Sequence, residues 1–214
     1  VNARAAAHEI ANAVLVAVTG KPGFFGGHIA AIGSQAGNKE VFVMGADGVG
    51  IQRVTRNGSI NLSPAWSRDG SKIAWTSYKR GNPDLYLKNL RSGRTRVLSN
   101  QKGINASPEF SVDGGQITLA RSEAGDTDLF LIDAKTGREI KRLTNGGGID
   151  VAPNFSPDGT AIVYASERSG GSQIYKLDLA TNASKRLSFD GSFNTDPVFS
   201  PDGTKVVFVG RNQG

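Results

Sequence analysis

Apolar and polar residues alternate along most of the chain in short runs that end at turn-forming residues. Valine, isoleucine and aromatic residues fill these runs, for example at residues 72–76 and 161–164, and Gly, Asp, Asn or Pro separates one run from the next. Alternation over four to eight residues, bounded by turn residues, is typical of β-strands. The pattern therefore predicts an all-β protein built from many short strands.

One ten-residue motif sets the order of these strands. It occupies residues 61–70, 105–114, 150–159 and 194–203, and its prolines Pro64, Pro108, Pro153 and Pro197 are spaced by 44, 45 and 44 residues. Four strands follow in each full period. A repeat of about 44 residues with four antiparallel strands is typical of a β-propeller blade. We predict three complete blades and two partial ones, at about residues 28–58, 60–102, 104–147, 149–191 and 193–214.

Each motif ends in Ser-x-Asp-Gly, which favours a type I turn. Proline, the preferred second residue of such a turn, is replaced by Arg68 and Val112 in two copies. An aromatic residue precedes every turn, namely Trp66, Phe110, Phe155 or Phe199. We expect Trp66 to be a core residue of its strand, so that Trp66→Ala costs about 3–5 kcal/mol.

The first 25 residues predict a helix and a linker. Residues 3–19 begin with an alanine-rich stretch after Asn2, which can cap a helix, and Gly20 marks its end. The uninterrupted apolar run, residues 13–18, is far shorter than the roughly 20 residues that cross a bilayer. We therefore predict a helix that is not inserted in a membrane, with the propeller at residues 26–214.

Composition narrows the chemistry. The chain has 214 residues and a net charge of +6, and it contains no cysteine, which excludes disulfides, thiolate catalysis and cysteine-ligated metal sites. Its basic residues recur at one phase of the repeat, alternating with apolar residues, which indicates solvated outer strands instead of a nucleic-acid surface. These residues are Arg94, Arg96, Lys141, Arg142, Lys185 and Arg186.

The sequence does not favour catalysis. Its two histidines, His8 and His28, belong to the helix and the first strand, and no Gly-x-Ser-x-Gly motif is present. Residues 45–50 lack the full dinucleotide-binding spacing and fit a turn, and Asp126 and Asp128 fit turn chemistry better than a metal site. We predict a protein that is not an enzyme and has no cofactor.

With these motifs in view, the chain resembles the TolB family over essentially its whole length. The resemblance rests on the aromatic-Ser-Pro-Asp-Gly repeats, each followed by a Leu-Tyr or Ile-Tyr strand, and on the helix and its exit at residues 8–25. It implies a small α/β domain followed by a closed six-bladed ring. Residues 1–25 are then the end of the amino-terminal domain, and no counterpart of the family's flexible segment that contacts TolA is present.

The resemblance also implies a function. It implies a non-enzymatic periplasmic protein of the Tol–Pal envelope system, which supports outer-membrane integrity and cell division. The resemblance further implies that the face of the propeller binds the lipoprotein Pal, and that in relatives the protein is a target of colicin-type peptides. The alternative is the propeller of a prolyl-oligopeptidase-like peptidase or of another propeller enzyme. Such a peptidase needs a hydrolase domain carrying a serine, a histidine and an acid.

Candidate binding residues lie three positions before each repeat proline. Innermost strands of a propeller run along its central channel, so equivalent residues at their starts form a polar ring that can accept a peptide backbone or a hydrated cation. The other interpretation is that these side chains only hydrogen-bond the local backbone. The predicted partner-binding residues are Asn61, Ile104, Asn105, Ser107, Asp150, Val151, Asn194, Thr195 and Asp196.

Two apolar strands are predicted to be open edges. Residues 29–32 and 206–208 have no predicted partner on one side, and exposed strand edges tend to pair with other strands. We therefore expect either self-association or contact with further chain.

Overall fold

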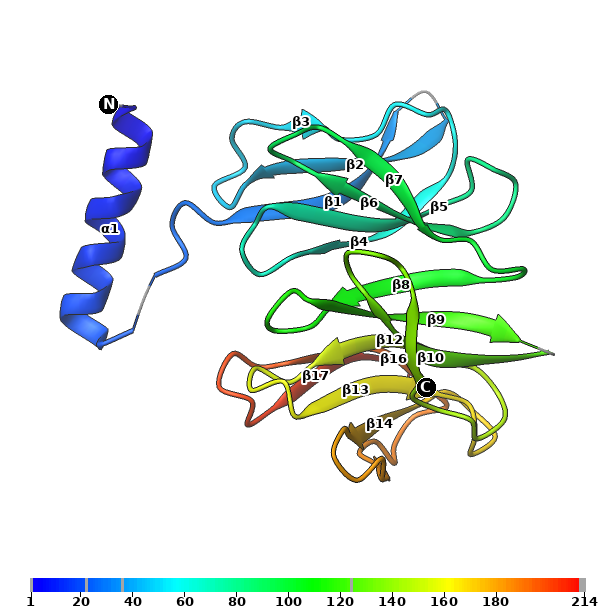
Figure 1. Cartoon of the computed structure of the whole chain (residues 1–214). Helices are drawn as coiled ribbons and strands as arrows, with labels where there is room; N and C mark the ends of the chain where they lie inside the picture. The colour runs from blue at the N-terminus through cyan, green and yellow to red at the C-terminus, as the bar shows by residue number, and fades with distance from the viewer. Residues whose placement is uncertain (1, 22, 36, 124, 212–214) are drawn as a thin grey trace. The chain divides into compact units, whose positions relative to one another are not determined.

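The structure is a computed structural model that describes residues 2–21, 23–35, 37–123 and 125–211. The chain forms two compact units, Val1–Gly58 and Ser59–Gly214. Figure 1 shows a helix and a small sheet in the first unit and a series of antiparallel sheets in the second. The predicted all-β class, with one short helix and four-stranded antiparallel sheets, is confirmed.

The first unit begins with α1 (Ala3–Thr19). The side chain of Asn2 accepts a hydrogen bond from the backbone N–H of Arg4 (3.1 Å), and Gly20 ends the helix in a left-handed conformation, as predicted. Three antiparallel strands follow in the order β1 (His28–Gln35), β2 (Asn38–Gly45) and β3 (Gln52–Arg53). The third strand has only two residues.

Polar contacts hold the helix within its unit. Arg4 and His8, one turn apart, both contact the carboxylate of Asp47 in the β2–β3 turn. Asn12 exchanges two hydrogen bonds with the backbone of Phe25, at 2.7 and 3.1 Å. The segment after the helix therefore runs back along it.

The second unit holds three four-stranded sheets and one two-stranded sheet, all antiparallel. The first sheet is β4 (Asn61–Trp66), β5 (Lys72–Ser77), β6 (Asp84–Asn89) and β7 (Thr95–Ser99). The second is β8 (Asn105–Phe110), β9 (Gln116–Glu123), β10 (Asp126–Asp133) and β11 (Glu139–Arg142). The third is β12 (Asp150–Phe155), β13 (Ala161–Ser166), β14 (Gln173–Asp178) and β15 (Ser184–Arg186), followed by β16 (Phe193–Phe199) and β17 (Val206–Arg211). Their first strands β4, β8, β12 and β16 lie side by side in chain order.

The hydrophobic core of this unit lies between neighbouring sheets. One cluster joins Leu85 and Leu87 of β6 to Ile117 and Leu119 of β9. A second cluster joins the β8–β11 sheet to Ile162 and other residues of the β12–β15 sheet. Burying one such leucine or isoleucine contributes about 1.5–3 kcal/mol, so each sheet is stabilised mainly by the next one.

The aromatic residue of the repeat is not equally buried in every sheet. Phe110 and Phe155 are buried, and each belongs to the cluster that contains residues of the preceding sheet. Trp66 is half-buried, and Ala65 beside it is the core residue of β4. The expectation that Trp66 is a core residue is therefore wrong, and a loss of about 3–5 kcal/mol is expected for Phe110→Ala or Phe155→Ala instead.

The side chains at the two predicted open edges are exposed to different degrees. Strand β17 pairs only with β16 among the described residues, and Val207 and Val209 are 69% and 61% exposed. At β1, Ile29 is exposed and Ile32 is half-buried. Pairing of either edge with further chain or with a second copy stays a prediction.

The Ser-x-Asp-Gly turns have one geometry in all four copies. The glycine N–H donates to the serine carbonyl at 2.8–2.9 Å, which is the bond of a type I turn. The serine hydroxyl donates to the aspartate two residues later, at 2.5–2.6 Å. The glycines have φ values of 66°, 70°, 73° and 70°, a left-handed conformation that other residues adopt only with strain.

These bonds lower the pKa of the turn aspartates. Ser156 donates to Asp158 and accepts the N–H of Ala161 at 2.9 Å, and its bond to Asp158 is the largest reason why the pKa of that carboxyl falls to about 2. We expect Ser156→Ala to lower the free energy of unfolding by about 1–2 kcal/mol, because buried bonds are lost. A lowered pKa contributes stability that is lost as pH falls through it. The variant should therefore lose less stability than the wild type between about pH 4 and pH 2.

Urea denaturation at neutral pH and at about pH 3 measures both effects. Ser192→Ala, at an exposed serine, is the control and should match the wild type. Equal stability of Ser156→Ala and the control would contradict the role of the turn.

Candidate partner-binding site

Each innermost strand is interrupted by a bulge at the same place in the repeat. The strand registers shift between Leu62 and Ala65 and at the equivalent points of the other three sheets. The residue before each repeat proline has a φ of about 50°, namely Ser63 (49°), Ser107 (51°), Ala152 (52°) and Asp196 (50°). Such a conformation costs a non-glycine residue on the order of 1–3 kcal/mol, and strain of this kind clusters at functional sites.

The four bulges surround a shallow cleft of about 290 Å³. The strained residues and the repeat prolines form its wall, together with Glu109, Asn154 and Val198. The cleft therefore lies where the four innermost strands run side by side. Ser107 and Asp196 belong to the predicted partner-binding set, so the structure brings this part of the set together.

The four polar residues at the starts of these strands are buried. Asn61, Asn105, Asp150 and Asn194 are 0, 0, 1 and 2% exposed. The amide of Asn61 donates to the carbonyl of Ser59, and its oxygen accepts from the indole N–H of Trp75 at 3.1 Å. These four side chains bond to their own sheets and loops, as the second interpretation of the sequence expects.

The same kind of bonding holds the other loops between blades. Asn105 donates to the carbonyl of Gln101 at 2.7 Å, and Asn194 donates to the carbonyl of Asp190 at 2.8 Å. Asp150 accepts from the guanidinium of Arg168 at 2.8 Å. The asparagines thus fix the segments that enter their innermost strands, whereas Asp150 ties the start of β12 to Arg168 beyond the end of β13.

The residue directly before each of these four buried polar residues is exposed and apolar. Ile104, which the sequence singled out, is 40% exposed, and Ile60, Ile149 and Phe193 occupy the same repeat position with exposures of 46, 44 and 43%. We call these four residues the apolar row. Only Ile104 was predicted, although each of the other three directly precedes a predicted polar residue, and that spacing was the signal available in the sequence. Val151 and Thr195 are half-buried one residue after the buried polar positions.

Glu109 is a titratable group of the cleft with a shifted pKa. Its carboxyl is half-buried and accepts a hydrogen bond from the amide of Asn154 at 3.1 Å. Asn154 is held in turn by the backbone N–H of Phe199 at 2.9 Å. Burial raises the pKa of Glu109 to about 7, so its charge changes near neutral pH. The sequence did not reveal this residue, because Asn154 and Phe199 come from two other strands, β12 and β16.

Residues 2–21, 23–35, 37–123 and 125–211 contain no group of three or more His, Asp or Glu side chains placed to hold a metal ion. Within the same ranges, no helix is both long and apolar enough to span a membrane.

Most of the chain matches one known protein family. Residues 16–214 match the TolB beta propeller domain. The chain belongs to this TolB β-propeller family. The solved structure of TolB from Acinetobacter baumannii superposes with a TM-score of 0.89 at 36% identity, over 98% of this chain and 53% of that one.

A curated relative gives the same family. The Tol-Pal system protein TolB of Desulfosudis oleivorans is 50% identical over 84 residues, which are 39% of this chain and 19% of that protein. Puromycin hydrolase shares the fold alone, with a TM-score of 0.67 at 16% identity. The chain thus spans about half of the solved TolB structure and matches about a fifth of its curated relative.

The raised pKa of Glu109 predicts a pH-dependent stability. Its value in the folded chain lies above the ordinary value of 4.5, so ionisation of Glu109 destabilises the folded state as pH rises from about 4.5 through 7. The variant Glu109→Gln cannot ionise. We expect it to gain stability relative to the wild type over this pH window, as measured by urea denaturation at about pH 4.5 and about pH 8.

Glu167→Gln changes an exposed carboxylate in the same way and serves as the control. A difference between Glu109→Gln and the wild type that is the same at both pH values would contradict the shifted pKa.

Proposed function

We propose that this chain is a protein-binding propeller of the Tol–Pal system that binds Pal through the edge carrying the apolar row and the adjoining cleft. The observation that carries this proposal is the repetition of one arrangement in four sheets. In each of them, an exposed apolar side chain precedes a buried polar residue and a strained bulge. We name Pal as the partner because the chain belongs to the TolB β-propeller family.

The chemistry of this edge suits a protein partner. Covering apolar surface contributes about 25 cal/mol per Å², and the four side chains of the apolar row are each 40–46% exposed. The buried residues beneath them hold their loops, which lowers the entropic cost of binding because the loops are already ordered. Asp196 and the half-buried Ser107 add polar groups at the cleft. Specific docking of a protein needs this combination of apolar contact and fixed polar groups.

Other parts of the function follow from the same proposal. The protein works in the periplasm without catalysis, and it contributes to outer-membrane integrity and cell division through its partner. A colicin-type peptide would use the same edge. The names of the curated relatives, which place them in the Tol–Pal system, support this assignment.

The peptidase alternative has weaker support. Its basis is a likeness of fold to puromycin hydrolase at 16% identity. The only two histidines of the sequence, His8 and His28, belong to the first unit, whereas the cleft lies in the second. No observation on the cleft favours hydrolysis, so binding remains the proposed function.

The test changes two exposed residues of the apolar row. Ile104→Arg combined with Ile149→Arg places two charges on the proposed interface, and desolvating them should weaken Pal binding at least about tenfold, or 1.4 kcal/mol. Binding of purified Pal to the immobilised full chain gives the affinity. Both side chains are exposed, so we expect an unchanged thermal melting curve.

The matched control is Ile140→Arg, because Ile140 is 50% exposed on the outer strand β11. It should bind Pal like the wild type. If the double variant and the wild type bind Pal equally, the assignment of this edge is wrong.

A further inference from the structure

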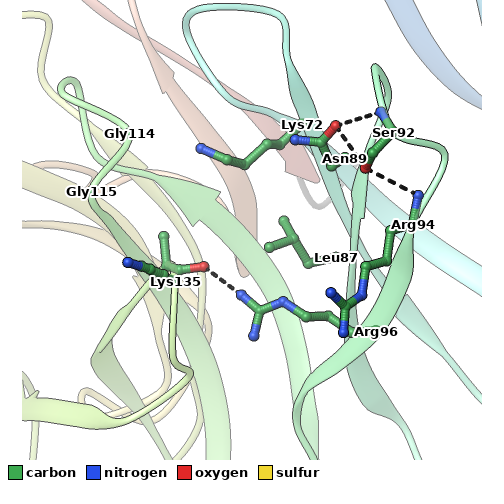
Figure 2. Close-up of a pocket in the computed structure, with 10 residues that line it drawn as sticks. Lys72, Leu87, Asn89, Ser92, Arg94, Arg96, Gly114, Gly115 and Lys135 are labelled. Atoms are coloured by element: carbon green, nitrogen blue, oxygen red, sulfur yellow. Dashed lines mark hydrogen bonds between the residues drawn. The ribbon is translucent and has the colours of Figure 1, made fainter.

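A second cleft, of about 640 Å³, lies between the β4–β7 sheet and the β8–β11 sheet. It shares no lining residue with the cleft between the innermost strands. Figure 2 shows its walls: strands of the first sheet on one side, and the turns at Gly114 and Lys135 of the second sheet on the other. Both sheets are complete in this chain, so the cleft is formed by two whole blades.

Strand register explains which side chains reach this cleft. Lys72 of β5 lies opposite Asn89 of β6, and Leu87 lies opposite Arg96 of β7. Residues two apart on a strand, and residues directly opposite each other, share one face of a sheet. Leu87 packs in the core cluster toward the second sheet, so Lys72 and Arg96 are on the face that looks toward that sheet.

The lining is strongly basic. It contains Lys72, Arg94, Arg96 and Lys135 and no aspartate or glutamate. The guanidinium of Arg96 is half-buried and donates to the carbonyl of Ala134 at 3.0 Å, which fixes it across the two sheets. Among the ion pairs that the described residues form, none involves Lys72, Arg94 or Lys135.

Nearby carboxylates are engaged elsewhere. Lys72 and Lys135 each help to lower the pKa of a turn aspartate, Asp69 and Asp133 respectively, but hydrogen bonds within the turns are the larger cause in both cases. Asp133 accepts the backbone N–H of Lys135 and the N–H and hydroxyl of Thr136. The positive charge of the cleft is therefore not cancelled by a direct ion pair with these aspartates.

The donors left to a ligand are the charged side chains and the side-chain amide of Asn89. Backbone N–H groups of the surrounding turns already donate to Asn89, Asp113 and Asp133. Lysine and arginine offer hydrogen-bond donors and no acceptors. A ligand that fills this cleft must therefore bring negative charge and acceptor oxygens, and the buried Leu87 and Ala134 give it a small apolar floor.

This charge is not a general property of the blades. Leu90, Ala134 and Leu179 make the same backbone contact in successive sheets, each donating to the turn between the first two strands. Arg91, Lys135 and Ala180 are thus equivalent. Between the second and third sheets, the places of Lys72, Asn89 and Lys135 are taken by Gln116, Asp133 and Ala180. The interface between the second and third sheets therefore has fewer cations and one more carboxylate. The basic lining is specific to the interface between the first and second sheets.

We propose that this cleft binds a soluble small molecule carrying two or more phosphate or carboxylate groups. Arginine and lysine bind such oxyanions through charge-assisted hydrogen bonds, and arginine does so bidentately. The site is a concave space between two sheets, which a compact polyanion can enter and the flat surface of an anionic membrane cannot. This site is separate from the proposed Pal-binding edge and does not depend on it.

Titration calorimetry of the full chain with pyrophosphate at low salt tests this proposal, and citrate provides the carboxylate ligand. The variant Lys72→Gln, Lys135→Gln removes one cation from each wall. Its affinity for pyrophosphate should fall at least about tenfold, because each charge-assisted bond contributes more than 1.4 kcal/mol. The control Lys141→Gln, Lys185→Gln removes the same charge from exposed outer-strand positions and should stay within about twofold of the wild type.

Three outcomes would overturn the proposal. They are failure of the wild-type chain to bind either anion at low salt, equal loss of affinity in both variants, and binding to vesicles of phosphatidylglycerol without binding to pyrophosphate. Loss of Pal binding in the Ile104→Arg, Ile149→Arg variant with unchanged pyrophosphate affinity would confirm that the two sites are separate.

Discussion

The structure of the second unit depends on hydrophobic contact between neighbouring sheets. No sheet buries its apolar face by itself: Leu85 and Leu87 are covered by Ile117 and Leu119, and the β8–β11 sheet is covered in turn by Ile162 and its neighbours. This contact fixes how the innermost strands lie beside one another. Both candidate sites are lined by residues that this packing brings together from neighbouring sheets.

The two sites use the packing differently. At the innermost strands, bulges and buried polar side chains form a rigid edge with little net charge, suited to a large partner that covers apolar surface. Between the β4–β7 and β8–β11 sheets, Lys72, Arg96 and Lys135 surround a space that is apolar only at its base. The first arrangement favours contact area and the second favours charge, so one fold can offer two kinds of recognition.

Much of the fold could be predicted from the sequence, because local rules decide it. Turn chemistry at Ser-x-Asp-Gly and the 44-residue period were enough to place the strands to within a few residues. The site was harder to predict. Whether Asn105 faces a partner or the carbonyl of Gln101 depends on the path of the preceding loop, which no local pattern specifies. Glu109 and the basic cleft depend on residues from separate strands, and no local pattern showed that Ala65, and not Trp66, is the core residue of β4.

The four Ser-x-Asp-Gly turns also show which substitutions the repeat has tolerated. Serine, aspartate and glycine are the same in every copy, and each makes a bond or adopts a dihedral angle that another residue would make less well. The second residue is Arg68, Val112, Pro157 or Pro201, so this position accepts very different side chains without altering the turn. Duplicated blades can thus diverge in charge at the turns between their first two strands while these strands keep the same path. A propeller can therefore acquire a blade-specific surface without any change of backbone.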